Sequence, residues 1–132
     1  MFKTQNTAGC AEKWSNRSSS LETEGLNMIS RIWHGWTTKA NAEAYESLLK
    51  NEIFIGIRNR RIPGYRGIHL LRRNLGDEVE FVTVMWFDSI EAVRAFAGED
   101  YQVAVVPPKA RALLLRFDER SQHYEVKAEM KA

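Results

Sequence analysis

Three histidines are the residues of this chain best suited to acid–base chemistry: His34, His69 and His123. Histidine is the side chain whose ordinary pKa lets it exchange protons near neutral pH. A metal ion could also use all three, but no H-x-H or H-E-x-x-H spacing occurs. We therefore predict no metal site and expect His69 or His123 to act as a base with a pKa near neutral. The alternative is that the histidines only form hydrogen bonds in or beside the core.

Large aromatic side chains are expected to surround this chemistry. Trp33 and Trp86 belong to strands that should be adjacent, while Tyr45, Phe96 and Tyr101 belong to helices that should cover the sheet. An apolar cleft with a few converging polar groups is typical of small-molecule sites. These five residues are therefore the candidate substrate-binding residues. The same aromatics would also suit an ordinary core, so their type alone does not separate the two.

The stretch RIWHGW concentrates these residue types in the first strand. Alternation along a strand places Trp33 on one face with Arg31, and His34 with Trp36 on the other. The pattern does not decide which face meets the helices. Gly35 predicts either a bulge, which would move Trp36 to the face of Trp33, or a close approach of another group to the backbone.

The elements that position these residues follow from periodicity and from turn residues. Capping residues (Thr37 or Thr38; Asp88 or Ser89) and turn residues (Pro63-Gly64; Gly76-Asp77) separate them. The expected strands are 28–36, 67–74, 79–87 and 121–126. The expected helices are 41–55 and 90–98, and the second is expected to continue through 99–106. A short helix that ends at Leu114 should follow.

The resulting β-α-β-β-α-β order predicts an α+β, ferredoxin-like fold with a four-stranded antiparallel sheet. We expect the strand order 4-1-3-2, with the first and third strands adjacent and parallel. In that order His69 lies on the edge strand away from His34 and His123. Adjacent strands are about 5 Å apart, which is a further argument against one ion shared by the three histidines.

The hairpin between the second and third strands predicts an oligomer. If Gly76-Asp77 forms a two-residue loop, Arg73 lies opposite Glu80. One face of the hairpin then carries His69, Leu71, Val82, Val84 and Trp86, and the other Ile68, Leu70, Phe81, Thr83 and Met85. Both faces are largely apolar, yet the helices can cover only one of them. We expect the other to meet a second copy of the chain, which gives a homodimeric α/β barrel.

Composition places the chain among single-domain proteins with a substantial core. It has 132 residues, a net charge of +2 and one cysteine, Cys10, so an intrachain disulfide is impossible. No signal peptide or transmembrane run is recognisable, and we expect a cytoplasmic protein with no membrane partner. We expect a disordered extension over 1–27, one domain over 28–127 and a frayed tail over 128–132.

Nucleotide and nucleic-acid functions are disfavoured. The sequence contains no G-x-G-x-x-G or G-x-x-x-x-G-K-[ST] phosphate loop and no G-x-S-x-G elbow. An RNA-recognition module shares the β-α-β-β-α-β order but requires basic and glycine positions on its third strand. Here that strand begins GDEVEFVTV, and its acidic residues would repel phosphate. We therefore expect no nucleic-acid partner.

Five segments from Met28 to Lys127 carry a family resemblance. They are MISRIWHGWT, AYESLL, PGYRGIHLLRR, EFVTVMWFDSIEAVRAFAGED and HYEV. With these segments the chain resembles the antibiotic biosynthesis monooxygenase family of dimeric α/β-barrel proteins. The W-x-D-S-x-E-A-[IV]-x-A-F-A-G pattern is the most specific of them.

The resemblance implies a small-molecule pocket between the sheet and the helices of each subunit. Some members of the family oxidise polycyclic phenols with O₂ and no cofactor, so the implied substrate is a small aromatic or polyketide-like molecule. Haem-degrading relatives use an asparagine on the first strand and a histidine on the second helix, and both are missing here. Other relatives are isomerases or have no demonstrated activity, so a non-catalytic homodimer that binds a small apolar ligand is the alternative.

Overall fold

The computed structural model of the chain describes residues 28–132. Within them, Ile29–Tyr124 form one compact unit, which contains the fold analysed below. Met28 and Glu125–Ala132 belong to a second unit, in which the Val126 amide donates to the Met28 carbonyl at 2.9 Å. The extension expected over 1–27, with Cys10, lies outside the described residues. No helix of the described part has the length and apolar character needed to span a membrane.

The described residues form a five-stranded sheet with the order β2-β3-β1-β4, in which β5 also pairs with β1. The strands are β1 (Ile29–Thr38), β2 (Tyr65–Leu75), β3 (Glu78–Phe87), β4 (Arg116–Phe117) and β5 (Gln122–Glu125). Since β5 is the expected last strand, the order 4-1-3-2 and the α+β class are confirmed. The two-residue strand β4 was not predicted.

The expected parallel pairing of the first and third strands is wrong. β1 and β3 are antiparallel, with Ile29 opposite Phe87 and Thr38 opposite Glu78. The reason is topological: the tight hairpin makes β3 antiparallel to β2, whereas the helical crossover returns β2 in the direction of β1. A strand inserted between β1 and β2 must therefore oppose both of them.

The hairpin register agrees with the prediction from its loop. Leu75 pairs with Glu78 across Gly76-Asp77, and Gly76 adopts a φ of 76°, which glycine tolerates best. Arg73 lies opposite Glu80 and donates to its carboxylate. The predicted division of the hairpin side chains between two faces follows from this register.

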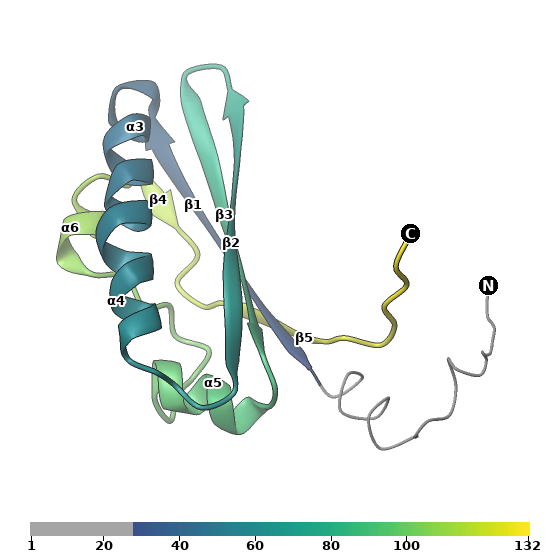
Figure 1. Cartoon of the computed structure of the whole chain (residues 1–132). Helices are drawn as coiled ribbons and strands as arrows, with labels where there is room; N and C mark the ends of the chain where they lie inside the picture. Colours follow the sequence, from purple (N-terminus) through teal and green to yellow (C-terminus); the bar gives the residue numbers. More distant parts are fainter. Residues whose placement is uncertain (1–27) are drawn as a thin grey trace, which may run out of the picture. The chain divides into compact units, whose positions relative to one another are not determined.

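Helices cover one face of the sheet (Figure 1). A helical segment follows β1 as α3 (Lys39–Leu48), the π-helix η1 (Leu49–Ile53) and α4 (Phe54–Asn59), while α5 (Ile90–Ala97) and α6 (Pro108–Arg111) come later. Hydroxyl groups begin two of these helices. Thr38 accepts from the Asn41 amide at 3.1 Å, and Ser89 accepts from the Ala92 amide at 3.2 Å.

The helical continuation expected over 99–106 is absent, and this prediction is wrong. Gly98, with a φ of 99°, ends α5, and the chain then leaves the helix axis. The backbone of the following segment bonds instead to residues near 120. The Ala104 amide donates to the Glu119 carbonyl at 2.9 Å, and the Ser121 amide donates to the Gln102 carbonyl. These partners lie far along the chain, so helical periodicity could not identify them.

Gly35 makes room for the indole of Trp33. The pairing of β1 with β3 continues through Gly35 without a bulge, so the second expectation, a close approach, is the one observed. A Cβ at residue 35 would lie 2.6 Å from Cη2 of Trp33 and 3.0 Å from Cδ2 of Leu114. The indole is held in place because its Nε1 donates to the Asp118 carbonyl at 2.8 Å.

We predict that Gly35→Ala destabilises the protein by about 1–3 kcal/mol, because the indole cannot move away without losing its hydrogen bond. The free energy of unfolding in urea measures this effect. Gly56→Ala is the matched control: a Cβ there meets nothing within 4 Å. Since residue 56 lies inside α4, that substitution should stabilise by about 0.5–1 kcal/mol. Equal stabilities of the two variants would contradict the role assigned to Gly35.

Candidate functional site

Trp33 faces the helices, whereas His34 and Trp36 face the other side of the sheet. Trp33 packs in one core cluster with Tyr45, Leu49 and Phe81. His34 and Trp36 stack on each other instead, with ring centroids 6.1 Å apart. Because no bulge interrupts β1, the strict alternation expected from the sequence holds along this strand.

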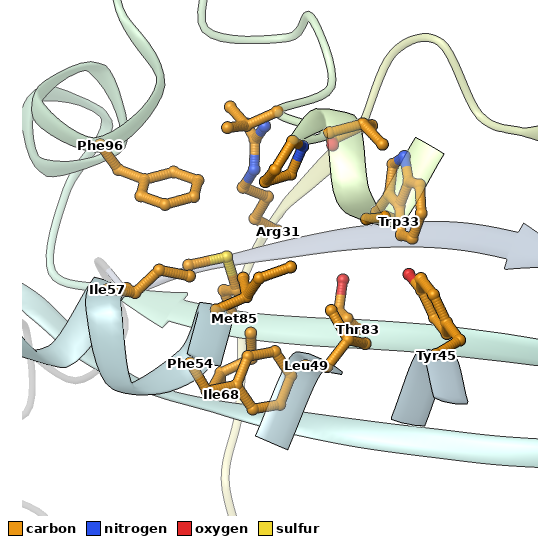
Figure 2. Close-up of a pocket in the computed structure, with 16 residues that line it drawn as sticks. Arg31, Trp33, Tyr45, Leu49, Phe54, Ile57, Ile68, Thr83, Met85 and Phe96 are labelled. Carbon is orange, nitrogen blue, oxygen red and sulfur yellow. The ribbon is translucent and has the colours of Figure 1, made fainter. Parts of the chain in front are cut away.

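A pocket lies between the sheet and the helices (Figure 2). Its volume is about 60 Å³. Sixteen described residues line it: Arg31, Trp33, Tyr45, Leu49, Ile53, Phe54, Ile57, Ile68, Thr83, Met85, Phe96, Val105, Val106, Pro107, Ala110 and Ser121. Most are apolar, and no aspartate or glutamate is among them. A cavity of about 150 Å³ accommodates benzene, so an aromatic ligand requires this lining to move apart.

The floor and wall of the pocket contain a segment suited to such movement. Leu49, Ile53 and Phe54 come from η1 and the start of α4. A π-helix is an irregular, i→i+5 bonded turn, and such turns are frequent at functional sites. Met85, on the sheet side, has a flexible side chain that adapts to different shapes. The sequence reading treated this helix as regular and did not identify its π turn.

Arg31 is the only charged residue that lines the pocket within the described chain. Its side chain is almost fully buried, with 3% exposed. Nη1 donates to the Tyr101 carbonyl and lies 2.9 Å from Nε2 of His123, while Nη2 donates to the Val103 carbonyl at 3.2 Å. Burial lowers the pKa of the guanidinium to about 10, so it stays protonated at neutral pH.

His123 is held in its neutral form beside this charge. Burial, followed by the positive charge of Arg31, lowers its pKa from 6.5 to about 4. The near-neutral pKa expected from the sequence is therefore not found. Because arginine can only donate, Nε2 of His123 is the acceptor and its proton is on Nδ1. Nδ1 is buried and has no hydrogen-bond partner within the described residues.

Each member of the Arg31–His123 pair contacts an aromatic ring: Arg31 contacts Phe96, and His123 contacts Tyr101. The guanidinium carbon of Arg31 lies 5.4 Å from the centroid of the Phe96 ring. The rings of Tyr101 and His123 meet edge to face with centroids 5.0 Å apart. Phe96 thus lines the pocket directly, whereas Tyr101 touches the residues that hold Arg31.

Three hydroxyl groups, those of Tyr45, Thr83 and Ser121, add to the polar lining of the pocket. Figure 2 shows the oxygens of Tyr45 and Thr83 pointing in the same direction, near Trp33. Burial raises the pKa of the Tyr45 phenol well above its ordinary value, so it remains a neutral donor. Thr83 lies directly opposite Trp33 across the β1–β3 pairing.

His69 and Trp86 lie on the opposite face of the sheet, which the helices do not cover. The Trp86 indole Nε1 donates to Nδ1 of His69 at 3.1 Å, and the two rings meet edge to face. Another histidine on that face, His34, has Nδ1 at 2.7 Å from Oδ2 of Asp118. Neither His69 nor Trp86 lines the pocket.

The structure thus brings together some of the residues expected to form a site. Trp33, Tyr45 and Phe96 line the pocket, and Tyr101 and His123 reach it through Arg31. Arg31, the pocket's cation, was not among the expected site residues. The sequence feature that could have identified it is its position: Arg31 is an arginine on the same strand face as Trp33, where the other residues are apolar. Residues 28–132 contain no group of three or more metal-ligating side chains.

Solved structures of antibiotic biosynthesis monooxygenases share this fold. One proposed member, from Bacillus cereus, matches with a TM-score of 0.57 and 15% identity over 80% of this chain and 96% of its own. Another, from Nitrosomonas europaea, has a TM-score of 0.56 and 12% identity over 75% and 89%. Rv0793 from Mycobacterium tuberculosis has a TM-score of 0.50 and 17% identity over 80% and 98%.

No family model matches the sequence, and no curated protein is similar enough to count as a match. At these identities the likeness to solved structures establishes the fold. The α+β fold that the sequence resemblance implies for the single chain is thereby confirmed.

We predict that the free energy of unfolding falls as the pH drops from about 6.5 to about 4, because the unfolded chain protonates His123 before the folded chain does. Above pH 6.5 the imidazole is neutral in both states, so its contribution is complete there. His123→Gln, whose amide oxygen can still accept from Arg31, should remove about 1–2 kcal/mol of this pH dependence after solvent screening. Urea unfolding at several pH values measures it; parallel curves for both proteins would contradict the lowered pKa.

Proposed function

We propose that the chain binds a small aromatic or polyketide-like molecule in this pocket and oxidises it with O₂ as a cofactor-independent monooxygenase. The observation that supports this most is the position of the pocket. It lies between the sheet and the helices, its walls include Trp33, Tyr45 and Phe96, and its polar groups are few. The fold shared with monooxygenase structures is consistent with the proposal but does not assign a reaction.

The reaction places simple requirements on the protein. A hydroxyarene that has lost its proton has an electron-rich ring carbon, to which O₂ adds; loss of water then leaves a quinone. One O₂ is consumed, one oxygen atom enters the product and the other leaves as water. The pocket must bind the ring, remove it from solvent and favour its ionised form.

Neither His123 nor His69, the two histidines expected to act as the base, is well suited to take a proton from a ligand in this pocket. Nε2 of His123 already accepts a hydrogen bond from Arg31, and the pKa of about 4 leaves it a weak base. We therefore propose that His123 positions Arg31 and acts on the substrate only through it. His69 is bonded to Trp86 on the uncovered face and does not line this pocket, so it is not the base for a ligand bound here.

The alternative is a protein that binds a small apolar molecule without converting it. The small size of the pocket favours this candidate function. At about 60 Å³ the lining must already move apart for a ring alone, and it must move further for a ring and O₂ together. Binding without oxygen consumption would support this alternative over the monooxygenase.

We predict that the chelator-treated protein consumes one O₂ for each molecule of a hydroxyarene such as 1-naphthol converted to its quinone. Thr83→Phe should lower the rate by about tenfold or more, because the added ring occupies the pocket. An oxygen electrode and the absorbance of the quinone measure both. The control Ala44→Phe adds the same ring at an exposed position of α3 and should retain the rate. An equal loss of rate in both variants, or no oxygen uptake by the unmodified protein, would contradict the proposed reaction.

We also propose that the uncovered sheet face meets a second copy of the chain, which gives a homodimeric α/β barrel. This face carries Ile32, Val82, Val84, Trp86 and Leu71, of which Leu71 is 51% exposed. Solvent-exposed apolar faces of this kind are uncommon on monomers. A twofold interface would pair the face with itself.

Sedimentation velocity tests the dimer. The unmodified protein should sediment as a dimer, and Val84→Glu should shift it to monomer, because Val84 lies in β3 between His69 and Ile32 at the centre of the face. A charge buried there would lack a partner. Ala44→Glu introduces the same charge on the exposed side of α3 and should leave the dimer intact. A monomer in the unmodified protein at all concentrations would overturn the proposal.

A further inference from the structure

We propose that the ligand of this pocket carries an aromatic oxyanion, a phenolate or enolate oxygen, which binds the guanidinium of Arg31. The inference builds on the proposed function, since it assumes that the pocket is a ligand site. It adds the charge state in which the ligand binds and the residue that selects it.

The charge of Arg31 has no counter-ion within the described residues. Its three partners are neutral: the carbonyls of Tyr101 and Val103 and the imidazole of His123. No carboxylate forms an ion pair with it among residues 28–132, and no neighbouring charge raises its pKa. Burying an ion without a partner of opposite charge is unfavourable. A ligand oxyanion would supply the missing charge.

Two exposed arginines pack against the aromatic rings next to Arg31, and neither supplies a negative charge. Arg60 lies 5.4 Å from the centroid of the Phe96 ring and donates to the Ala95 and Phe96 carbonyls, which are also neutral. Arg94 lies 5.3 Å from the centroid of the Tyr101 ring, and its only carboxylate neighbour within the described residues, Glu91, is 3.9 Å away. Their charges lie at the surface and do not neutralise Arg31.

Arg31 still has donors to offer. A guanidinium has five N–H groups, and three hydrogen bonds within the described residues leave two of them for a ligand. Figure 2 shows the side chain reaching the pocket from β1 between Phe96 and Trp33. An oxygen bound there would place its ring among the apolar and aromatic walls. In this proposal Arg31 binds the ligand oxygen in addition to linking the 101–103 segment to the sheet.

The proposal changes how a substrate would lose its proton. A cation a few ångströms from a phenol stabilises its ionised form and lowers its pKa by about 1–3. The pocket would then bind a substrate that is already ionised, or ionise it on binding. A strong protein base would not be required, which agrees with the neutral state of His123.

The test measures the ionisation of 4-nitrophenol when bound to the unmodified protein. The absorbance of the phenolate band is followed against pH with and without saturating protein, and the pKa of the bound phenol should be lower by about 1–3. The neutral analogue 4-nitroanisole should bind at least about tenfold more weakly in equilibrium dialysis. An apolar pocket without a nearby cation would raise the pKa of the bound phenol. The direction of the pKa shift therefore distinguishes an oxyanion site from a purely apolar pocket.

Three variants test whether Arg31 causes the lowered pKa of bound nitrophenol. Arg31→Met should abolish the lowered pKa of bound nitrophenol, and Arg31→Lys should retain part of it. Arg58→Met removes an exposed arginine from α4 and should change nothing. Nitrophenol that binds with an unchanged or raised pKa overturns the role of Arg31 while leaving the pocket as a ligand site. Absence of any binding overturns both proposals, whereas a lowered pKa without oxygen uptake supports the oxyanion site and removes only the reaction.

Discussion

The buried guanidinium of Arg31 links the sheet, the segment after α5 and β5. It extends from β1 to the carbonyls of Tyr101 and Val103 and to the imidazole of His123. Carbonyls turned toward a buried cation are not available to continue α5, which explains why residues 99–106 depart from the helix. Among residues 28–132 this charge is compensated by neutral groups only, the carbonyl and imidazole dipoles and the Phe96 ring. This is the physical reason for regarding the pocket as a place for an anion.

The opposite end of the pocket depends on close packing around Trp33. Its indole lies over Gly35, donates to the Asp118 carbonyl and contacts the cluster that includes Tyr45. This end is rigid because a buried aromatic ring with a satisfied N–H has few alternative positions. The π turn of η1 and the unbranched side chain of Met85 line the rest of the pocket, so we expect the pocket to open on the side of the helix.

The two faces of the sheet differ in chemistry although both are rich in aromatics. On the helix-covered face the polar groups are few, and Arg31 lines the cavity without a carboxylate partner among the described residues. On the uncovered face they form pairs: His34 with Asp118, His69 with Trp86, and Arg116 stacked 4.7 Å from the Trp36 ring centroid. Pairing of polar groups beside exposed apolar residues suits a protein interface. The same residue types therefore make different kinds of contact on the two faces.

The sequence by itself determined the order of the elements, the register of the hairpin and the division of each strand into two faces. These features depend on local patterns: turn residues at Gly76-Asp77, alternation along β1 and capping hydroxyls such as Ser89. Only the tertiary structure decided which face carries the pocket, the direction of β1 against β3 and the path of 99–106. It also buried His123 beside Arg31, and the burial, followed by the charge of Arg31, lowers the pKa of His123. Those outcomes depend on contacts between residues of different elements, well separated along the chain. Local periodicity carries no information about such contacts.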